Sequence, residues 1–219
     1  MQKAVYKKYR RWFDLLLKLN LPVIGTYIQD KIYDHAFFED ANELKKLSSK
    51  KVAEIIDSFF HFKSILDIGC GCGLYIEELH RLGKDVLGCD SSIDAIRMAA
   101  ADITVFYADV TQPIYLNRQF DLVLCFEVAE HIKKKHSRQL VQTCTQYSDT
   151  VIFTAAPPGQ GGVGHINEQP YEFWIRLFAE YRFQYDHELS ERVKAVMKEK
   201  DVVEWIANNF MVFHKQPKA

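Results

Sequence analysis

The chain has 219 residues, of which 48% are hydrophobic and 26% are charged, and its formal net charge is −1. This length and composition predict one soluble domain with a sizeable core. The near-zero net charge excludes a global electrostatic attraction to nucleic acid. The 5 cysteines are scattered through expected strands and loops, which favours free thiols, a reducing compartment and a cytoplasmic location.

Residues 1–62 are predicted to form a helical extension ahead of a domain at 63–219. Near the start, apolar residues recur at helical spacing, which predicts a helix that packs on its own domain or lies on anionic lipid. Charged residues such as Asp14 and Lys18 interrupt this stretch, so no membrane span is expected. A further helix is expected from Asn42 to about Phe60. Between the two helices lie candidates for a lid: Tyr27, Tyr33, His35 and Phe37.

From Ser64 the hydrophobic pattern alternates between strands and helices, which predicts a parallel sheet with helices on both faces. Parallel strands are expected at 64–68, 85–89, 104–108, 120–126 and 150–155. Helices are expected near 74–82, 92–100, 137–147 and 171–180. The tail predicts strands at 181–189 and 209–215 with helical residues between them, and the glycine cluster at 159–164 predicts a mobile loop.

The stretch 65–73 reads Ile-Leu-Asp-Ile-Gly-Cys-Gly-Cys-Gly. A strand that leads into a glycine turn and a helix is typical of nucleotide-like cofactor sites, because glycine lets backbone N–H groups approach the ligand. The spacing is GxGxG rather than the GxGxxG of dinucleotide sites. Asp67 at its mouth favours an amine-bearing ligand over a pyrophosphate. Asp90 ends the next expected strand, 21 residues beyond Gly69, where an acid reaches a ribose diol.

These residues resemble motif I and the following acidic strand of the class I S-adenosylmethionine-dependent methyltransferases, and the likeness runs from about Lys63 to Lys215. It implies a Rossmann-like α/β fold whose mostly parallel seven-stranded sheet ends in a C-terminal antiparallel hairpin. It also implies S-adenosyl-L-methionine as cofactor, with Asp67 facing the ammonium and Asp90 the ribose. The implied cofactor-binding residues are Asp67, Gly69, Cys70, Gly71, Gly73, Asp90, Ser91, Asp109, Val110, Phe126 and Glu127.

The later members of that set follow the third and fourth expected strands. The resemblance implies that Asp109 hydrogen-bonds the adenine amino group and that the Val110 N–H reaches the ring. A turn or helix cap is the alternative role for Asp109. Phe126 and Glu127 are expected to line the methionine end.

A second group of polar residues follows the fourth expected strand. Glu127, Glu130 and His131 are spaced i, i+3, i+4, so a helical turn would place them on one face. This ExxEH pattern resembles that of ubiquinone-biosynthesis O-methyltransferases and of enzymes that methylate the terminal 2′-hydroxyl of small RNAs. The resemblance implies Mg²⁺ or Mn²⁺ held by Glu127, Glu130, His131 and His165. Without a metal, His131 braces the loop, or His131 or His165 acts as a general base.

The acceptor is predicted from weaker signals. Glu-Val-Ala-Glu after the fourth strand, instead of Asn/Asp-Pro-Pro-Tyr, favours a hydroxyl acceptor. The run from Ala155 to Pro170 resembles methyltransferases associated with glycan synthesis, which indicates a sugar. A basic cluster is either a solvated surface or a guide for an anionic acceptor such as a phosphosugar or a nucleic-acid end: Lys133, Lys134, Lys135, His136 and Arg138.

The sequence therefore predicts O-methylation of a small-molecule or carbohydrate-like hydroxyl. Two alternatives stay open. One is 2′-O-methylation of an RNA 3′ end, and the other is a non-catalytic methyltransferase-like binding protein.

Overall fold

The computed structural model of the protein describes residues 35–217. The expected N-terminal helical face and the lid candidates Tyr27 and Tyr33 lie outside this range. The side chains of the other two candidates, His35 and Phe37, likewise lie outside what is described. Among the described helices, none combines the length and the apolar character that a membrane crossing requires.

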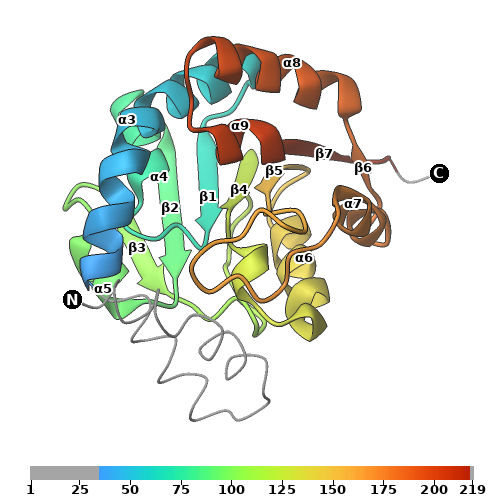
Figure 1. The fold of residues 1–219 in the computed structure, drawn as a ribbon, viewed down its shortest axis with the longest axis horizontal. Helices are drawn as coiled ribbons and strands as arrows, with labels where there is room; N and C mark the ends of the chain where they lie inside the picture. The colour runs from blue at the N-terminus through green and yellow to red at the C-terminus, as the bar shows by residue number, and fades with distance from the viewer. Residues whose placement is uncertain (1–34, 218–219) are drawn as a thin grey trace.

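Seven strands in the described part of the chain form one sheet in the order β3-β2-β1-β4-β5-β7-β6 (Figure 1). The first five run parallel to one another, whereas β7 is antiparallel to both β5 and β6. This confirms the expected mostly parallel sheet with an antiparallel C-terminal pair. The strands are β1 (Ser64–Ile68), β2 (Asp85–Asp90), β3 (Thr104–Tyr107), β4 (Leu122–Phe126), β5 (Thr150–Thr154), β6 (Phe183–Tyr185) and β7 (Met211–Lys215).

Helices cover both faces of this sheet (Figure 1). One apolar core joins the sheet to α6 and α7, and the other joins it to α3, α4, α8 and α9. Every residue of β4 is buried, as expected for a central parallel strand between two helical layers. The helices are α3 (His35–Phe59), α4 (Leu74–Arg81), α5 (Ile93–Met98), α6 (Ser137–Gln146), α7 (Tyr171–Ala179), α8 (His187–Glu199) and α9 (Glu204–Asn209), with the 3₁₀ turns η1 (Ala129–His131) and η2 (Lys134–His136).

The second half of the predicted N-terminal extension packs on the sheet. Helix α3 begins at His35, earlier than the expected Asn42. Its residues Ile55 and Ile56 share a core with Ile65 of β1. The predicted domain boundary at 62/63 falls in the connection between α3 and β1, and it stays a prediction.

The tail differs from the expectation at 181–189. The strand there is limited to β6, because Asp186 starts a helix: its side chain accepts a hydrogen bond from the Leu189 N–H at 2.9 Å. An aspartate at this position satisfies a backbone donor that the first helical turn leaves without a partner. The helical residues expected between 190 and 208 form two helices, α8 and α9, rather than one.

The strand order reverses at β1, which has β2 on one side and β4 on the other. In open α/β sheets, ligands bind at the carboxyl ends of the strands where the order reverses. The loop after β1 and the residues after β4 meet at this point. A Cβ built on Gly69 would lie 2.4 Å from Val128 Cγ2. The fold therefore brings both sequence motifs to one edge of the sheet.

Candidate cofactor and acceptor site

The glycine loop after β1 uses backbone conformations that other residues rarely adopt. Gly69, Gly71 and Gly73 have φ values of 73°, 58° and 76°, in the left-handed region that glycine enters without a Cβ penalty. A Cβ at Gly73 would lie 2.6 Å from Ile103 Cδ1. The dihedral angles therefore favour glycine at both ends of the loop, and at Gly73 an added Cβ would also displace the end of the Ile103 side chain.

Asp90 ties this loop to the next crossover. Its Oδ2 accepts a hydrogen bond from the Gly71 N–H at 2.8 Å, and its Oδ1 accepts one from the Ser92 N–H at 2.8 Å. The exposed Ser91 lies between them. The acid at the end of β2 thus fixes the middle of the glycine loop and the start of α5 together.

Cys70 takes part in the loop through its backbone. Its N–H donates to the Cys89 carbonyl at 3.0 Å. Burial, with the nearby carboxylates of Asp67 and Asp90, raises the pKa of the Cys70 thiol well above its usual value. The sulfur therefore stays protonated and does not act as a thiolate ligand or nucleophile.

Asp109 closes a local turn after β3. Its Oδ1 accepts a hydrogen bond from the Thr111 N–H at 2.8 Å, which matches the turn interpretation. The next residue, Val110, is buried. The Ala108 N–H bonds to the Asp90 carbonyl at 3.0 Å, so this turn lies against the strand that carries the expected ribose-binding acid. Contact of Asp109 and Val110 with adenine stays a prediction.

Glu127 follows β4 in a strained backbone conformation. Its φ is 55° although it has a Cβ, and such outliers gather at functional sites. The Thr154 hydroxyl accepts from its N–H at 2.9 Å, which holds the strained residue in place. The preceding Phe126 is buried. Both residues lie at the carboxyl edge of the sheet, where the methionine end of the cofactor is expected.

The Glu127 side chain joins a polar network that the sequence did not reveal. Its Oε1 accepts from Asn209 Nδ2 at 3.2 Å, and the same amide group donates to Gln160 Oε1 at 3.0 Å. Asn209 Oδ1 accepts from the Tyr171 hydroxyl at 3.0 Å. Asn209 lies far from its partners along the chain and in no motif, so no sequence signal could have found it.

The expected helical face of Glu127, Glu130 and His131 is wrong. The 3₁₀ turn η1 begins at Ala129, and the positive φ of Glu127 turns that residue away toward Asn209. The structure instead groups Glu130, His131 and His165, whose ligand atoms lie within 4.8 Å of one another. One carboxylate and two imidazoles suit a borderline divalent cation. This group offers three protein ligands to a metal ion. Metal binding stays a prediction.

The glycine-rich loop, expected to be mobile, is anchored by Glu168. Its Oε2 accepts from the Gly159 N–H at 2.8 Å and its Oε1 from the Gly161 N–H at 2.6 Å. His165 Nδ1 lies 3.0 Å from Oε1. Burial opposes ionisation of Glu168, but these donors outweigh it and lower the pKa of the carboxyl below its usual value. The carboxylate thereby holds the His165 ring through Nδ1.

Asn167 fastens the same loop to the residues after β4. Its side chain is buried and its Nδ2 donates to the Ala129 carbonyl at 3.0 Å and to Ser137 Oγ at 3.1 Å. Its N–H and that of Ile166 donate to the Glu130 carbonyl. These bonds explain why His165 meets the ExxEH turn although the two segments are distant in sequence.

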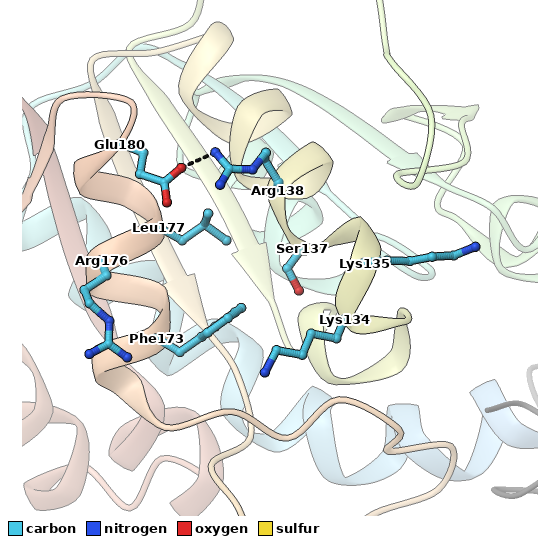
Figure 2. Close-up of a pocket in the computed structure, with 8 residues that line it drawn as sticks. All are labelled: Lys134, Lys135, Ser137, Arg138, Phe173, Arg176, Leu177 and Glu180. Atoms are coloured by element: carbon cyan, nitrogen blue, oxygen red, sulfur yellow. Dashed lines mark hydrogen bonds and ion pairs between the residues drawn. The ribbon is translucent and has the colours of Figure 1, made fainter.

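The basic cluster borders a groove of about 350 Å³ between α7 and the start of α6, but its cations do not converge on that groove (Figure 2). Lys135 and Arg176 point away, and Arg138 pairs with Glu180. Lys134 Nζ lies 5.1 Å from the centre of the Phe173 ring. This arrangement favours the solvated-surface interpretation.

Residues 65–148 match the family described as methyltransferase domain. The ubiquinone biosynthesis O-methyltransferase of Sinorhizobium medicae is 35% identical over 127 residues, which covers 55% of this chain and 45% of that protein. Its counterpart in Glaesserella parasuis is 33% identical over 94 residues, or 37% and 39% of the two chains. The chain spans less than half the length of these relatives.

Solved structures agree with the fold. A sugar N-methyltransferase from Streptoalloteichus superposes with a TM-score of 0.59 at 15% identity, covering 78% of this chain and 87% of that one. A SAM-bound amino pentose methyltransferase from Micromonospora echinaspora gives a TM-score of 0.59 at 15% identity, covering 77% and 90%. The fold, the glycine loop and these matches define a methyltransferase domain. Residues 65–148 are thus similar to a methyltransferase-domain family, and the seven-stranded sheet has the fold of class I methyltransferases.

Proposed function

We propose that this protein binds S-adenosylmethionine and transfers its methyl group to a hydroxyl of a small-molecule or carbohydrate-like acceptor. The observation that carries the proposal is the glycine loop after β1, at the point where the strand order reverses. Asp90 Oδ2 accepts a hydrogen bond from the Gly71 N–H of this loop at 2.8 Å. Relatives named as O-methyltransferases support the hydroxyl. The likeness in fold to a sugar N-methyltransferase and an amino pentose methyltransferase is compatible with a sugar-like acceptor.

When bound, the cofactor supplies an electrophilic methyl group on a sulfonium. The residues of this chain then have three tasks, which are to align the acceptor, exclude water and remove the hydroxyl proton. Phe126 and Glu127 line the methionine end in this proposal. His165 accepts the proton at Nε2, since its Nδ1 is held by Glu168 at 3.0 Å. The Glu168 carboxylate stabilises the imidazolium that forms, as in other acid-oriented histidine bases.

His131 supports the same step. Its ring lies edge-on to that of His165, with centroids 5.0 Å apart, and its Nδ1 lies 3.4 Å from the Gly164 carbonyl. We propose that His131 either holds the loop in place or acts together with His165 as the proton acceptor. Because the side chain of His165 is only 9% exposed, the proton leaves into a site that excludes most solvent.

The metal alternative uses the same residues. Glu130, His131 and His165 would hold Mg²⁺ or Mn²⁺, and the ion would lower the pKa of a coordinated acceptor hydroxyl. The Glu168 contact to His165 also matches the carboxylate partner that metal-bound histidines commonly have. Mn²⁺ affinity of the wild type and Glu130→Gln decides this alternative. Equal affinity, or no binding by either protein, would remove the metal from the proposal.

The first test is a thermal-melt titration with S-adenosylhomocysteine, with NAD⁺ as control. Ligand at about 100 times its Kd adds about 2.7 kcal/mol to the free energy of unfolding, or about 5–10 °C in melting temperature for a domain of this size. We expect a shift with S-adenosylhomocysteine alone. A shift with neither ligand would overturn the proposal.

The second test measures S-adenosylhomocysteine release in the presence of candidate acceptors, including sugars, phosphosugars, catechols and RNA 3′ ends. We expect a carbohydrate-like or aromatic hydroxyl to be methylated, and His165→Gln to lose transfer while it keeps cofactor binding. Turnover of RNA with a steep dependence on salt would favour the RNA alternative. Binding without any transfer would favour the non-catalytic one.

A further inference from the structure

A buried tyrosine hydroxyl lies at the same edge of the sheet and belongs to no motif. Tyr75, the second residue of α4, is 6% exposed, and its hydroxyl oxygen is buried without a hydrogen-bond partner. Nearly all buried polar groups in proteins have such a partner, and an exception calls for an explanation. A buried hydroxyl left without a bond costs free energy, which a ligand can offset by supplying the missing partner.

The position of Tyr75 identifies which ligand group it would meet. Its ring packs edge-on against that of Phe126, the last residue of β4, with centroids 5.2 Å apart. It lies two residues after Gly73, the N-cap of α4 and the last glycine of the loop. Tyr75 therefore lies between the start of α4, next to the glycine loop, and the end of β4, where the methionine end of the cofactor is proposed to bind.

The surroundings of the hydroxyl are negatively charged. Burial raises the pKa of the Tyr75 phenol strongly, and the carboxylates of Glu127 and Asp67 raise it further. The hydroxyl is therefore neutral, and it lies within electrostatic reach of two acidic side chains, one in β1 and one just after β4. Such surroundings repel an anionic ligand group and attract a cationic one. A neutral hydroxyl can accept a hydrogen bond from that cation.

We infer that the Tyr75 hydroxyl is a ligand-binding group that accepts a hydrogen bond from the α-ammonium of the cofactor's methionine portion. This inference rests on the proposed function. It makes Tyr75 a positioning residue that holds the amino-acid end of the cofactor between Asp67 and Glu127. The orientation of the sulfonium methyl toward the acceptor depends on how firmly that end is held.

The test compares Tyr75→Phe with the wild type on two ligands. S-Adenosylhomocysteine carries the amino-acid group, whereas 5′-methylthioadenosine keeps the adenosine and the thioether but lacks it. Hydrogen bonds to charged groups predict that Tyr75→Phe weakens S-adenosylhomocysteine binding about tenfold or more. We expect the affinity for 5′-methylthioadenosine to stay unchanged. Isothermal titration calorimetry measures both constants.

A matched control separates ligand binding from stability. Tyr147 is also buried, but its hydroxyl donates to the Ile114 carbonyl and accepts from the Leu116 N–H at 2.9 Å. Tyr147→Phe should lower the melting temperature of the ligand-free protein and leave S-adenosylhomocysteine affinity intact. Tyr75→Phe should show the reverse, with a ligand-free melting temperature that is unchanged or higher, because it removes a hydroxyl without a partner.

The outcomes distinguish the inference from the proposed function. If Tyr75→Phe lost affinity for both ligands equally, or for neither, the inference would be overturned. Binding by the wild type would still support the cofactor site in that case. A lowered ligand-free melting temperature together with unchanged S-adenosylhomocysteine binding would also overturn it. Failure of the wild type to bind either ligand would overturn the proposed function and this inference with it.

Discussion

The two sides of the strand-order reversal are built in different ways. On the cofactor side, the loop after β1 is held by its own backbone and by Asp90, with hydrogen bonds at Gly71 and Ser92. On the acceptor side, the site is assembled from the ends of β4 and β5, a long loop and α9, and side chains such as Glu168 and Asn209 hold it. The comparison indicates that a backbone-built site tolerates few changes of residue type. A side-chain-built site can change its chemistry by substitution.

The largest effect is expected at Gly69 on the cofactor side. Gly69→Ala combines a left-handed φ of 73° with a contact of 2.4 Å to Val128 Cγ2, which should cost about 2–5 kcal/mol of stability. Gly83→Ala is the matched control, since its φ is 81° but nothing lies within 4 Å of the added Cβ. It should cost about 1–2 kcal/mol. Urea denaturation measures both, and equal losses would show that crowding at Val128 does not matter.

The next effect concerns the acid that holds the glycine loop. Asp90→Ala removes the acceptor of two backbone N–H groups and the proposed ribose partner, so S-adenosylhomocysteine affinity should fall at least about 100-fold. Asp121 is the control, because its carboxylate also accepts from two backbone groups, Lys63 and Ser64, at 2.8 and 2.9 Å. Asp121→Ala should lower stability and leave affinity unchanged. Similar S-adenosylhomocysteine affinities for the two variants would contradict the proposed role of Asp90 in cofactor binding.

A smaller effect is expected on the acceptor side at Asn209. Asn209→Ala removes hydrogen bonds to polar atoms of Glu127, Gln160 and Tyr171, which should cost about 1–3 kcal/mol of stability. Asn208→Ala removes a weaker exposed contact to Glu204 at 3.4 Å and should change stability by about 0.5 kcal/mol or less. If the comparison holds, Asn209→Ala weakens S-adenosylhomocysteine binding much less than Asp90→Ala. A comparable loss would show that the two sides act as one unit.

The smallest effect is a pH dependence at Glu168. Because its folded-state pKa is lowered, ionised Glu168 stabilises the fold above its ordinary pKa of 4.5, and this contribution is lost as pH falls through the folded-state value. Wild type should therefore be more stable than Glu168→Gln at pH 7 by about 1 kcal/mol or less, and the difference should shrink toward pH 3. Chemical denaturation at both pH values measures it. A constant difference would show that the charge is not responsible.

The fold and the backbone of the glycine loop could be predicted from the sequence, because their signals are local. Glycines at alternate positions, an acid at the end of the next strand and the strand–helix rhythm each lie within a short segment. The error at 181–189 arose because one residue, Asp186, ends a strand and caps a helix, and periodicity alone does not register a cap. On the acceptor side, the sequence indicated candidate residues but not the contacts between them. The helical face proposed for Glu127 failed because a single positive φ redirects its side chain.

By itself, the sequence determined the class of sheet and the conformation of the glycine loop, since backbone conformation and burial follow from neighbouring residues. Only the tertiary structure decided the partners of the polar side chains. It grouped His165 with Glu130 and His131, placed Glu168 behind His165, joined Asn209 to Glu127, and left the Tyr75 hydroxyl without a partner beside two acids. These contacts join segments distant along the chain. Their geometry depends on how strands and loops pack, which no local pattern encodes.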